Sequence, residues 1–355
     1  MDKHNRKERI SVKTEIIVVD NFSTKEIGYT QAINLLIAGD TVAFPTETVY
    51  GLGAIATNES AVAKIFEAKG RPQDNPLIVH IGSKEELQAF THNVPNLAKV
   101  CMDTFWPGAL TLVLPLQQGS LAKNVTAGLN SVGVRMPDHP VALELLSRLK
   151  QPVAAPSANR SGKPSPTKAS HVFHDLNGKV PFILDGGATG MGLESTVLDF
   201  TSEIPTILRP GGVTKEMLER VIGPVHESKL TDHAEAPRAP GMKYAHYAPN
   251  APVYLIEASL QKVQLAIESI HSEQKKVALI ATEQFKTTHV DYFFSLGKEH
   301  QLEDAAQLLY EALRSCDETD ADIVLVPTFS KQGVGTAIMN RLEKAANGNY
   351  FSTNI

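Results

Sequence analysis

The stretch PTETVYGLGA, residues 45–54, directly follows the apolar run Thr41 to Phe44 and places hydroxyls, a carboxylate and a phenol before two glycines. The apolar run predicts a buried strand, and loops at strand ends commonly carry ligand sites. A simpler alternative is that the glycines only permit a turn while the threonines bond local backbone groups. The stretch therefore predicts an α/β fold and a candidate site, with both interpretations open.

The same alternation continues on both sides, over residues 13–223, where β-rich runs are separated by helical stretches and Gly/Pro loops. The predicted strands include Glu15–Val19, Thr41–Phe44, Pro76–Ile81, Leu110–Leu116 and Pro181–Leu184. A helix is expected from near Thr24 to Gly39, with Ile27, Ala32, Leu35 and Leu36 on its apolar face. A second is expected over 58–68, with Asn58 as its N-cap. This pattern predicts an α/β domain with a mixed sheet.

The rest of the chain divides into three further parts. Residues 1–12 are basic and polar and are predicted to form a flexible tail. Residues 224–250 are polar, rich in Pro and Ala and lack apolar periodicity, as in a linker. Over 251–355, strands are expected at 253–257, 276–281, 292–296 and 322–327, and helices up to about 270 and at 302–315 and 336–346. Strands alternating with helices predict a smaller, mainly parallel α/β domain.

Composition points to an ordinary globular protein. The chain has 355 residues, 42% hydrophobic and 21% charged, with a formal net charge of -5. This acidic balance disfavours a protein whose main task is to grip a phosphate backbone. The two cysteines, Cys101 and Cys316, are too few for a zinc site and are expected to be buried. No signal peptide or membrane span is recognisable, so a cytoplasmic location and no membrane partner are expected.

The segment KGRPQDNPLIVHI, residues 69–81, combines cations with stiff backbone. Lys69 and Arg71 are two residues apart, so in an extended segment both side chains leave the same face, which suits a polyphosphate. Pro72 and Pro76 restrict the residues before them to extended conformations. A solvated basic loop is the alternative. His80 follows the apolar run and is locally as consistent with a structural as with a functional histidine.

Three later segments carry isolated polar groups. In SVGVRMPDHP, residues 131–140, Arg135 stands among apolar neighbours and needs an anionic partner, either a protein carboxylate or a ligand. The small residues of PVAAPSANRSGKPSPT, residues 152–167, let a ligand approach backbone amides, although a plain loop is also possible. Ser195 in GLESTVLDF and Arg209 in TILRPGGV mean little by themselves.

The common nucleotide and zinc motifs are missing from the sequence. It contains no GxxxxGK[ST] phosphate loop, no GxGxxG fingerprint, no HExxH and no paired CxxC. Any ATP must therefore be held in another way.

Taken together, the motifs resemble a known enzyme family. The segments PTETVYGLGA, KGRPQDNPL, SVGVRMP, SANRSGKPS, EST, RPGG and APGMKYAHYAP are similar to those of the long form of threonylcarbamoyl-AMP synthase. The resemblance implies a YrdC-type twisted mixed sheet around a large basic cavity, plus a smaller Rossmann-like domain. It also implies nucleotidyl transfer that joins L-threonine, bicarbonate and ATP into L-threonylcarbamoyladenylate, pyrophosphate and water, the first step of threonylcarbamoyladenosine modification of tRNA.

The resemblance also assigns roles to residues. Threonine is expected to meet Thr48, His80, Arg135, Ala155 and Ser195. ATP is expected to meet Lys69, Arg71, Asn75, Ser131, Ser157, Asn159, Ser165, Arg209 and Tyr247. Lys69 and Arg71 are the expected catalytic residues, because they can stabilise charge at the α-phosphate. Tyr247 implies that residues 224–250 form a lid over the site.

Cofactor and partner expectations follow from the same resemblance. Mg²⁺ is expected to bind through ATP phosphates and waters, with no protein metal ligand. Transient contact with the downstream tRNA threonylcarbamoyl transferase machinery is expected, without tight tRNA binding. Two alternatives are an RNA-binding module, which the acidic net charge disfavours, and a carbamoyl transferase of the hydrogenase-maturation type, which would need cysteine-rich zinc fingers.

Overall fold

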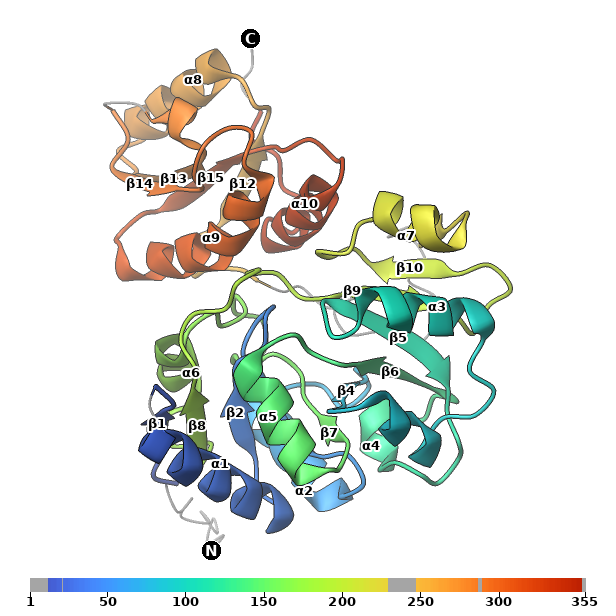
Figure 1. Ribbon diagram of the computed structural model, residues 1–355. Helices are drawn as coiled ribbons and strands as arrows, with labels where there is room; N and C mark the ends of the chain where they lie inside the picture. Colours follow the sequence, from blue (N-terminus) through green and yellow to red (C-terminus); the bar gives the residue numbers. More distant parts are fainter. Residues whose placement is uncertain (1–11, 21, 229–246, 287–288, 353–355) are drawn as a thin grey trace, which may run out of the picture.

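The computed structural model describes residues 12–20, 22–228, 247–286 and 289–352. The predicted tail at 1–12 and most of the predicted lid at 224–250 therefore lie outside the described residues, and the proposed domain boundaries stay predictions. Within the described part, two separate sheets are present, one built from residues 15–227 and one from residues 253–327 (Figure 1).

The first sheet is mixed and has eleven strands among the described residues, in the order β1-β8-β2-β3-β7-β4-β6-β5-β9-β10-β11. Its strands are β1 (Glu15–Val18), β2 (Val42–Phe44), β3 (Gly51–Ile55), β4 (Ile78–His80), β5 (Leu110–Pro115), β6 (Ser131–Arg135), β7 (Val153–Ala154), β8 (Phe182–Asp185), β9 (Thr196–Asp199), β10 (Thr206–Arg209) and β11 (His226–Glu227). Parallel and antiparallel neighbours alternate irregularly: β4 pairs parallel with β6 but antiparallel with β7. The predicted mixed α/β sheet is confirmed.

Helices cover both faces of this sheet. They are α1 (Phe22–Ile37), α2 (Glu59–Lys69), η1 (Lys84–Ala89), α3 (Asn96–Phe105), α4 (Lys123–Thr126), α5 (Pro140–Leu149), α6 (Ala169–Leu176) and α7 (Lys215–Ile222). Side chains alternate between the faces, as a strand requires: Val42 and Phe44 pack with α1 and α5, whereas Ala43 packs with the cluster that contains α2. Both faces of the sheet are therefore covered by apolar packing. Polar side chains that could form a site lie at the strand ends and in the loops.

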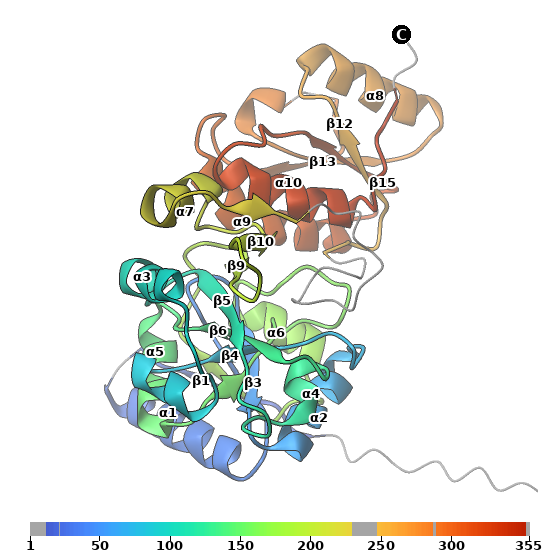
Figure 2. The ribbon, with the colours of Figure 1, turned by 90° about the vertical axis from the view of Figure 1, so that its right-hand side faces the viewer.

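The second sheet has the order β12-β15-β13-β14 and is parallel throughout. Its elements are β12 (Val253–Ile256), α8 (Leu260–Ser272), β13 (Val277–Ala281), η2 (Glu283–Phe285), β14 (Tyr292–Ser295), α9 (Leu302–Ser315), η3 (Cys316–Glu318), β15 (Ile323–Pro327) and α10 (Val334–Ala345). The expected Rossmann-like domain is confirmed. Helix α8 covers one face, while α9 and α10 cover the other and lie toward the first domain (Figure 2).

Three local expectations can be compared directly with the structure. Asn58 caps α2 by accepting a hydrogen bond from the Ala61 amide (3.1 Å). Cys101 and Cys316 are both buried and free. The prediction for Ile27 was wrong, because its side chain is 59% exposed on α1. No described helix has both the length and the apolar character needed to cross a bilayer.

Candidate active site

A cavity lies where the ends of several first-sheet strands meet the residues that precede the second domain. It is lined by Thr46, Thr48, Val49, Gly51, Lys69, Arg71, Ile78, His80, Arg135, Ala155, Pro156, Ser157, Asn159, Ser161, Ser165, Glu194, Ser195, Arg209 and Tyr247. Twelve of the fourteen expected site residues are in this set. Segments far apart in sequence therefore converge on one cavity.

Two expected site residues do not line the cavity. Asn75 is buried beside it, and its carbonyl accepts from Arg71 Nη2 at 3.5 Å. Ser131 is half-buried at the start of β6, where it pairs with Pro115 of β5. Contact of either side chain with a nucleotide remains an expectation.

The first segment, 45–54, combines both interpretations offered for it. Gly51 and Gly53 lie inside β3 rather than in a turn. A Cβ on Gly53 would come within 2.7 Å of the Phe44 ring, so that glycine serves packing. The threonines do bond locally, with Thr46 Oγ1 2.7 Å from Thr48 Oγ1. Both threonines nevertheless line the cavity.

Arg135 is the centre of one end of the cavity. It is 3% exposed at the end of β6, and its Nη1 donates to Glu47 Oε1 and to Thr48 Oγ1, both at 2.9 Å. The anionic partner that Arg135 was expected to need is therefore Glu47. Arg135 Nε is buried and has no hydrogen-bond partner among the described residues. A donor left this way is available to a ligand acceptor.

His80 lies beside Arg135 on the neighbouring strand β4, in register with it. Burial, followed by the nearby charge of Arg135, holds the pKa of His80 well below its ordinary value. A neutral ring can accept a hydrogen bond at Nε2, which lies 3.3 Å from Arg135 Nη2. His80 thus supports the guanidinium without adding charge, which is a structural role, and it also lines the cavity, so its contact with a substrate stays a prediction.

Lys69 and Arg71 follow each other at the C-terminal end of α2, which Gly70 ends in a left-handed conformation (φ 62°). Lys69 Nζ donates to the carbonyls of Ser157 and Asn159, at 2.5 Å each. Burial, followed by the charge of Arg71, lowers the pKa of Lys69 well below its ordinary value. A bound phosphate would favour the charged ammonium, so this end of the cavity is suited to an anion.

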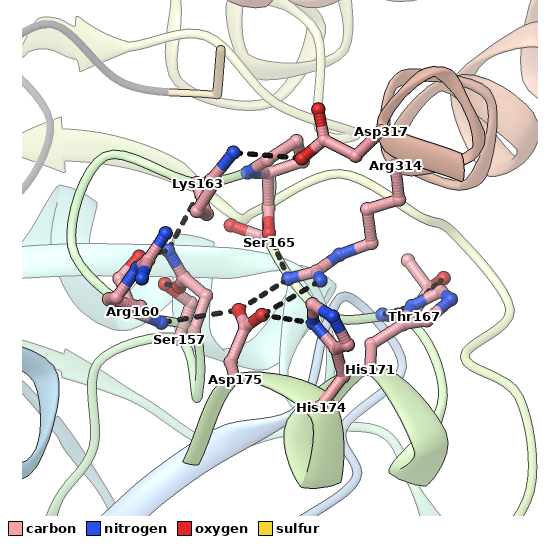
Figure 3. Close-up of polar contacts among 12 residues, drawn as sticks. Ser157, Arg160, Lys163, Ser165, Thr167, His171, His174, Asp175, Arg314 and Asp317 are labelled. Carbon is pink, nitrogen blue, oxygen red and sulfur yellow. Dashed lines mark hydrogen bonds and ion pairs between the residues drawn. The ribbon is translucent and has the colours of Figure 1, made fainter. Parts of the chain in front are cut away.

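The loop at 157–167 is tied down on all sides rather than being a plain surface loop. The Ala158 amide donates to Tyr50 O, and the Tyr50 amide donates to Pro166 O, both at 2.8 Å. Asp175 on α6 accepts from the Arg160 amide and from Arg314 of α9, and Lys163 pairs with Asp317 (Figure 3). Tyr50, which directly precedes β3, and the second domain therefore both hold the loop that carries Ser157, Asn159 and Ser165.

Ser195 and Arg209 form the remaining wall. Arg209 Nε and Nη2 donate to the Ser195 carbonyl at 3.1 and 3.0 Å, and Ser195 Oγ lies 2.7 Å from Thr111 Oγ1. The backbone of Gly211 packs directly against that of Ser195 and Thr196. A Cβ on Gly211 would lie 2.3 Å from the Thr196 amide nitrogen, so this contact requires glycine. Ser195 and Arg209, which mean little individually in the sequence, are thus joined by hydrogen bonds in one wall of the cavity.

Glu194 was missed by the sequence analysis, although its neighbour Ser195 was selected. It lines the cavity at 7% exposure, and its Oε1 accepts from Ser165 Oγ at 2.5 Å. Its other partners, Tyr310 and Arg341, come from α9 and α10. No local pattern reports partners that are more than a hundred residues away, so only the three-dimensional fold identifies this carboxylate.

Tyr247 is the first residue described after the gap at 229–246. It is 5% exposed with φ 71°, lines the cavity and stacks on Tyr310 with ring centroids 5.3 Å apart. The expected position of this tyrosine at the site is therefore present in the structure. Closure by the remaining lid residues stays a prediction.

Comparisons with known proteins agree along nearly the whole chain. Residues 34–211 match the family described as telomere recombination, and residues 213–347 match the threonylcarbamoyl-AMP synthase C-terminal domain. The threonylcarbamoyl-AMP synthase of Bacillus subtilis is 53% identical, over 93% of this chain and 96% of that protein. The Pyrococcus abyssi threonylcarbamoyl-AMP synthase is 47% identical, over 89% of this chain and 93% of that protein.

A solved structure extends the likeness to three dimensions. The crystal structure of P. abyssi Sua5 complexed with L-threonine superposes with a TM-score of 0.89 at 42% identity. The match covers 96% of this chain and 99% of the P. abyssi chain. The likeness thus includes both domains.

Proposed function

The chain belongs to the long-form threonylcarbamoyl-AMP synthase family, and we propose that the cavity described above is where it joins L-threonine, bicarbonate and ATP. The products are L-threonylcarbamoyladenylate, pyrophosphate and water. The observation that carries the proposal is the meeting of four basic side chains, Lys69, Arg71, Arg135 and Arg209, in one largely buried cavity. Such a cavity suits one substrate carboxylate and a polyphosphate together.

The Arg135 end is assigned to threonine. A guanidinium binds a carboxylate through two parallel hydrogen bonds, and Arg135 Nε is a buried donor that lacks a partner among the described residues. Thr48, His80, Ala155 and Ser195, which also line the cavity, are assigned to the same substrate. The P. abyssi structure complexed with L-threonine supports threonine as the substrate by relationship.

The opposite end is assigned to ATP. Lys69 and Arg71 face the phosphates, and the loop residues Ser157, Asn159 and Ser165 supply hydroxyl, amide and backbone groups. Arg209 and Tyr247 complete the nucleotide contacts. The depressed pKa of Lys69 supports this assignment, because phosphate would compensate the charge that burial disfavours.

The reaction has two bond-forming steps. The threonine amine attacks bicarbonate and water leaves, which gives a carbamate. A carbamate oxygen then attacks the α-phosphorus of ATP, and the bond to the β-phosphate oxygen breaks to release pyrophosphate. Lys69 and Arg71 hold the phosphates in line and neutralise the charge that grows on the leaving group. Enclosure of the cavity protects the carbamate from water.

Magnesium fits this site only as a partner of the nucleotide. Among the cavity-lining residues that the structure describes, the single carboxylate is Glu194, whose oxygens already accept from Ser165, Tyr310 and Arg341. Phosphate oxygens and waters would therefore supply the ligands, and the ion would neutralise phosphate charge when bound. The described residues contain no group of three or more His, Cys, Asp or Glu side chains that could hold a metal.

The remaining expectations belong to the same proposal. The labile adenylate would pass to the tRNA threonylcarbamoyl transferase machinery through transient contact, with no tight tRNA binding and a cytoplasmic location. The match of residues 213–347 to the family's C-terminal domain favours this reaction over carbamoyl transfer of the hydrogenase-maturation type.

The decisive assay supplies ATP, Mg²⁺, bicarbonate and labelled threonine, and measures threonine-dependent pyrophosphate and labelled adenylate. Wild type is expected to form both. Lys69→Ala and Arg71→Ala are each expected to lose roughly a hundredfold in kcat/KM, the scale of removing one group that stabilises transition-state charge. Lys64→Ala is the matched control, because Lys64 lies on the same helix and pairs with Asp40 at the surface. Normal turnover in the folded Lys69 and Arg71 variants would refute the assignment.

A further inference from the structure

Glu194 is an unusual side chain for this cavity. Among the described residues that line the cavity it is the one acidic side chain, and it lies beside Ser165 and Arg209, which are both assigned to ATP. A carboxylate there would repel a triphosphate unless its charge were compensated. The inference below rests on the proposed ATP site.

The larger part of the compensation comes from the second domain. Arg341 on α10 is fully buried, and its Nε donates to Glu194 Oε2 at 2.9 Å. Tyr310 on α9 donates to the same oxygen at 2.8 Å. Arg341 Nη1 also donates to the Pro210 carbonyl at 2.9 Å, beside Arg209. Arg341 itself does not line the cavity, so it reaches the nucleotide wall only from behind.

The 2.9 Å contact of Arg341 with Glu194 is an ion pair, and the pKa of Glu194 agrees with it. Burial alone would raise the pKa of Glu194, but the positive charges of Arg341 and Arg209 outweigh it and lower this pKa to about 2. Glu194 is therefore ionised at neutral pH. Without Arg341, Glu194 would be a buried carboxylate that has lost its ion-pair partner and keeps only part of its compensation, from Arg209, and the hydroxyl of Ser165 would still be directed to it.

We propose that Arg341 is a positioning residue for ATP: from the second domain it compensates Glu194 and thereby keeps the nucleotide wall receptive to phosphate. The second domain then takes part in nucleotide binding through the buried ion pair of Arg341 with Glu194. Simple docking of the two domains is the competing explanation, because Arg314–Asp175 and Lys163–Asp317 also join them.

The two explanations differ in what a second substitution does. If Arg341 acts through Glu194, then Arg341→Gln raises the KM for ATP at least about tenfold and changes the KM for threonine less than about threefold. Adding Glu194→Gln removes the uncompensated charge and restores the KM for ATP to within about threefold of wild type. A docking role predicts no such rescue, since the double variant has lost the contact completely.

The experiment is steady-state adenylate formation by full-length wild type, Arg341→Gln, Glu194→Gln and the double variant. Lys168→Gln is the interdomain control, because it breaks the exposed Lys168–Glu311 pair away from the cavity. A wild-type KM for ATP in Arg341→Gln, or a double variant as impaired as the single one, overturns the proposal.

If Arg341→Gln alone does not fold, Glu194→Gln can still be compared with the double variant. In the Glu194→Gln background, adding Arg341→Gln is expected to change the KM for ATP by less than about threefold, because the group through which Arg341 acts is already neutral. A further tenfold loss there contradicts the proposal. Absence of adenylate formation by wild type would instead reject the proposed function, so the two failures are distinguishable.

Discussion

At the scale of single residues, the cations were predictable and the carboxylates were not. Lys69, Arg71 and Arg135 stand in short stretches whose local composition already indicates anion binding. Glu47 stands in a stretch that the sequence does single out, but its pairing with Arg135 has no local signal, and neither has the pairing of Glu194 with Arg341, because these partners lie 88 and 147 residues away. Sequence therefore indicates what a ligand would meet, whereas the fold shows which charges hold those groups in place.

Replacement of Arg135 tests the threonine end. We expect Arg135→Gln to raise the KM for threonine by roughly thirty- to a hundredfold, which corresponds to losing a charged hydrogen-bonded contact of about 2–3 kcal/mol. The KM for ATP should change little, since Arg135 lies at the other end of the cavity. Steady-state kinetics with each substrate varied in turn measures both values.

An equal rise in both KM values would mean that Arg135 supports the whole fold of the site. Far-ultraviolet circular dichroism of the variant is the control, because Glu47 loses its guanidinium partner as well. An unchanged KM for threonine in a folded variant would remove Arg135 from the threonine site.

At the scale of elements, helices and strands were predictable where side-chain periodicity is strong. The helix expected at 302–315 coincides with α9, and Asn58 caps α2 as expected. Ile27 was assigned to the wrong face of α1, because this helix also carries apolar residues on its exposed side. The sheet order could not be predicted, since β7 has only two residues and joins β3 to β4 through tertiary pairing.

Helix α6 carries a pH-dependent contact between the domains. His171 Nδ1 accepts from the Thr167 amide at 3.2 Å, and Nε2 faces Glu311 on α9 at 3.2 Å. Burial, followed by the charge of Arg314, lowers the pKa of His171 to about 4. An unfolded chain protonates histidine near pH 6.5, so between pH 6.5 and 4 the unfolded state binds more protons. The stability from neutral His171 is thus complete above pH 6.5 and declines as pH falls to 4.

Urea unfolding at pH 7 and pH 5 measures this effect. From pH 7 to pH 5, the free energy of unfolding of wild type should fall by up to about 2 kcal/mol more than that of His171→Gln, because only wild type has this imidazole to protonate. Taking the difference between the two proteins cancels the contribution of other titrating groups. Equal losses in both proteins would show that His171 is not held neutral in the folded state.

At the scale of the whole molecule, two domains were predictable from composition, but their shared core was not. Val49 and Leu193 of the first domain belong to the same apolar cluster as Leu309 and Leu342 of the second. Packing between residues that are more than a hundred positions apart leaves no periodic pattern in the sequence. The chain has an acidic net charge, yet its cavity is basic, because the fold brings four buried basic side chains together there. The sequence alone does not show this convergence. The site is therefore a property of both domains together.

A crystal structure of the full chain with L-threonine and a non-hydrolysable ATP analogue tests this account most directly. We expect the threonine carboxylate on Arg135, the phosphates on Lys69 and Arg71, and Glu194 still bonded to Arg341. Threonine and nucleotide bound outside this cavity, or phosphates placed away from Lys69 and Arg71, would contradict the central claim that one cavity joins the two substrates.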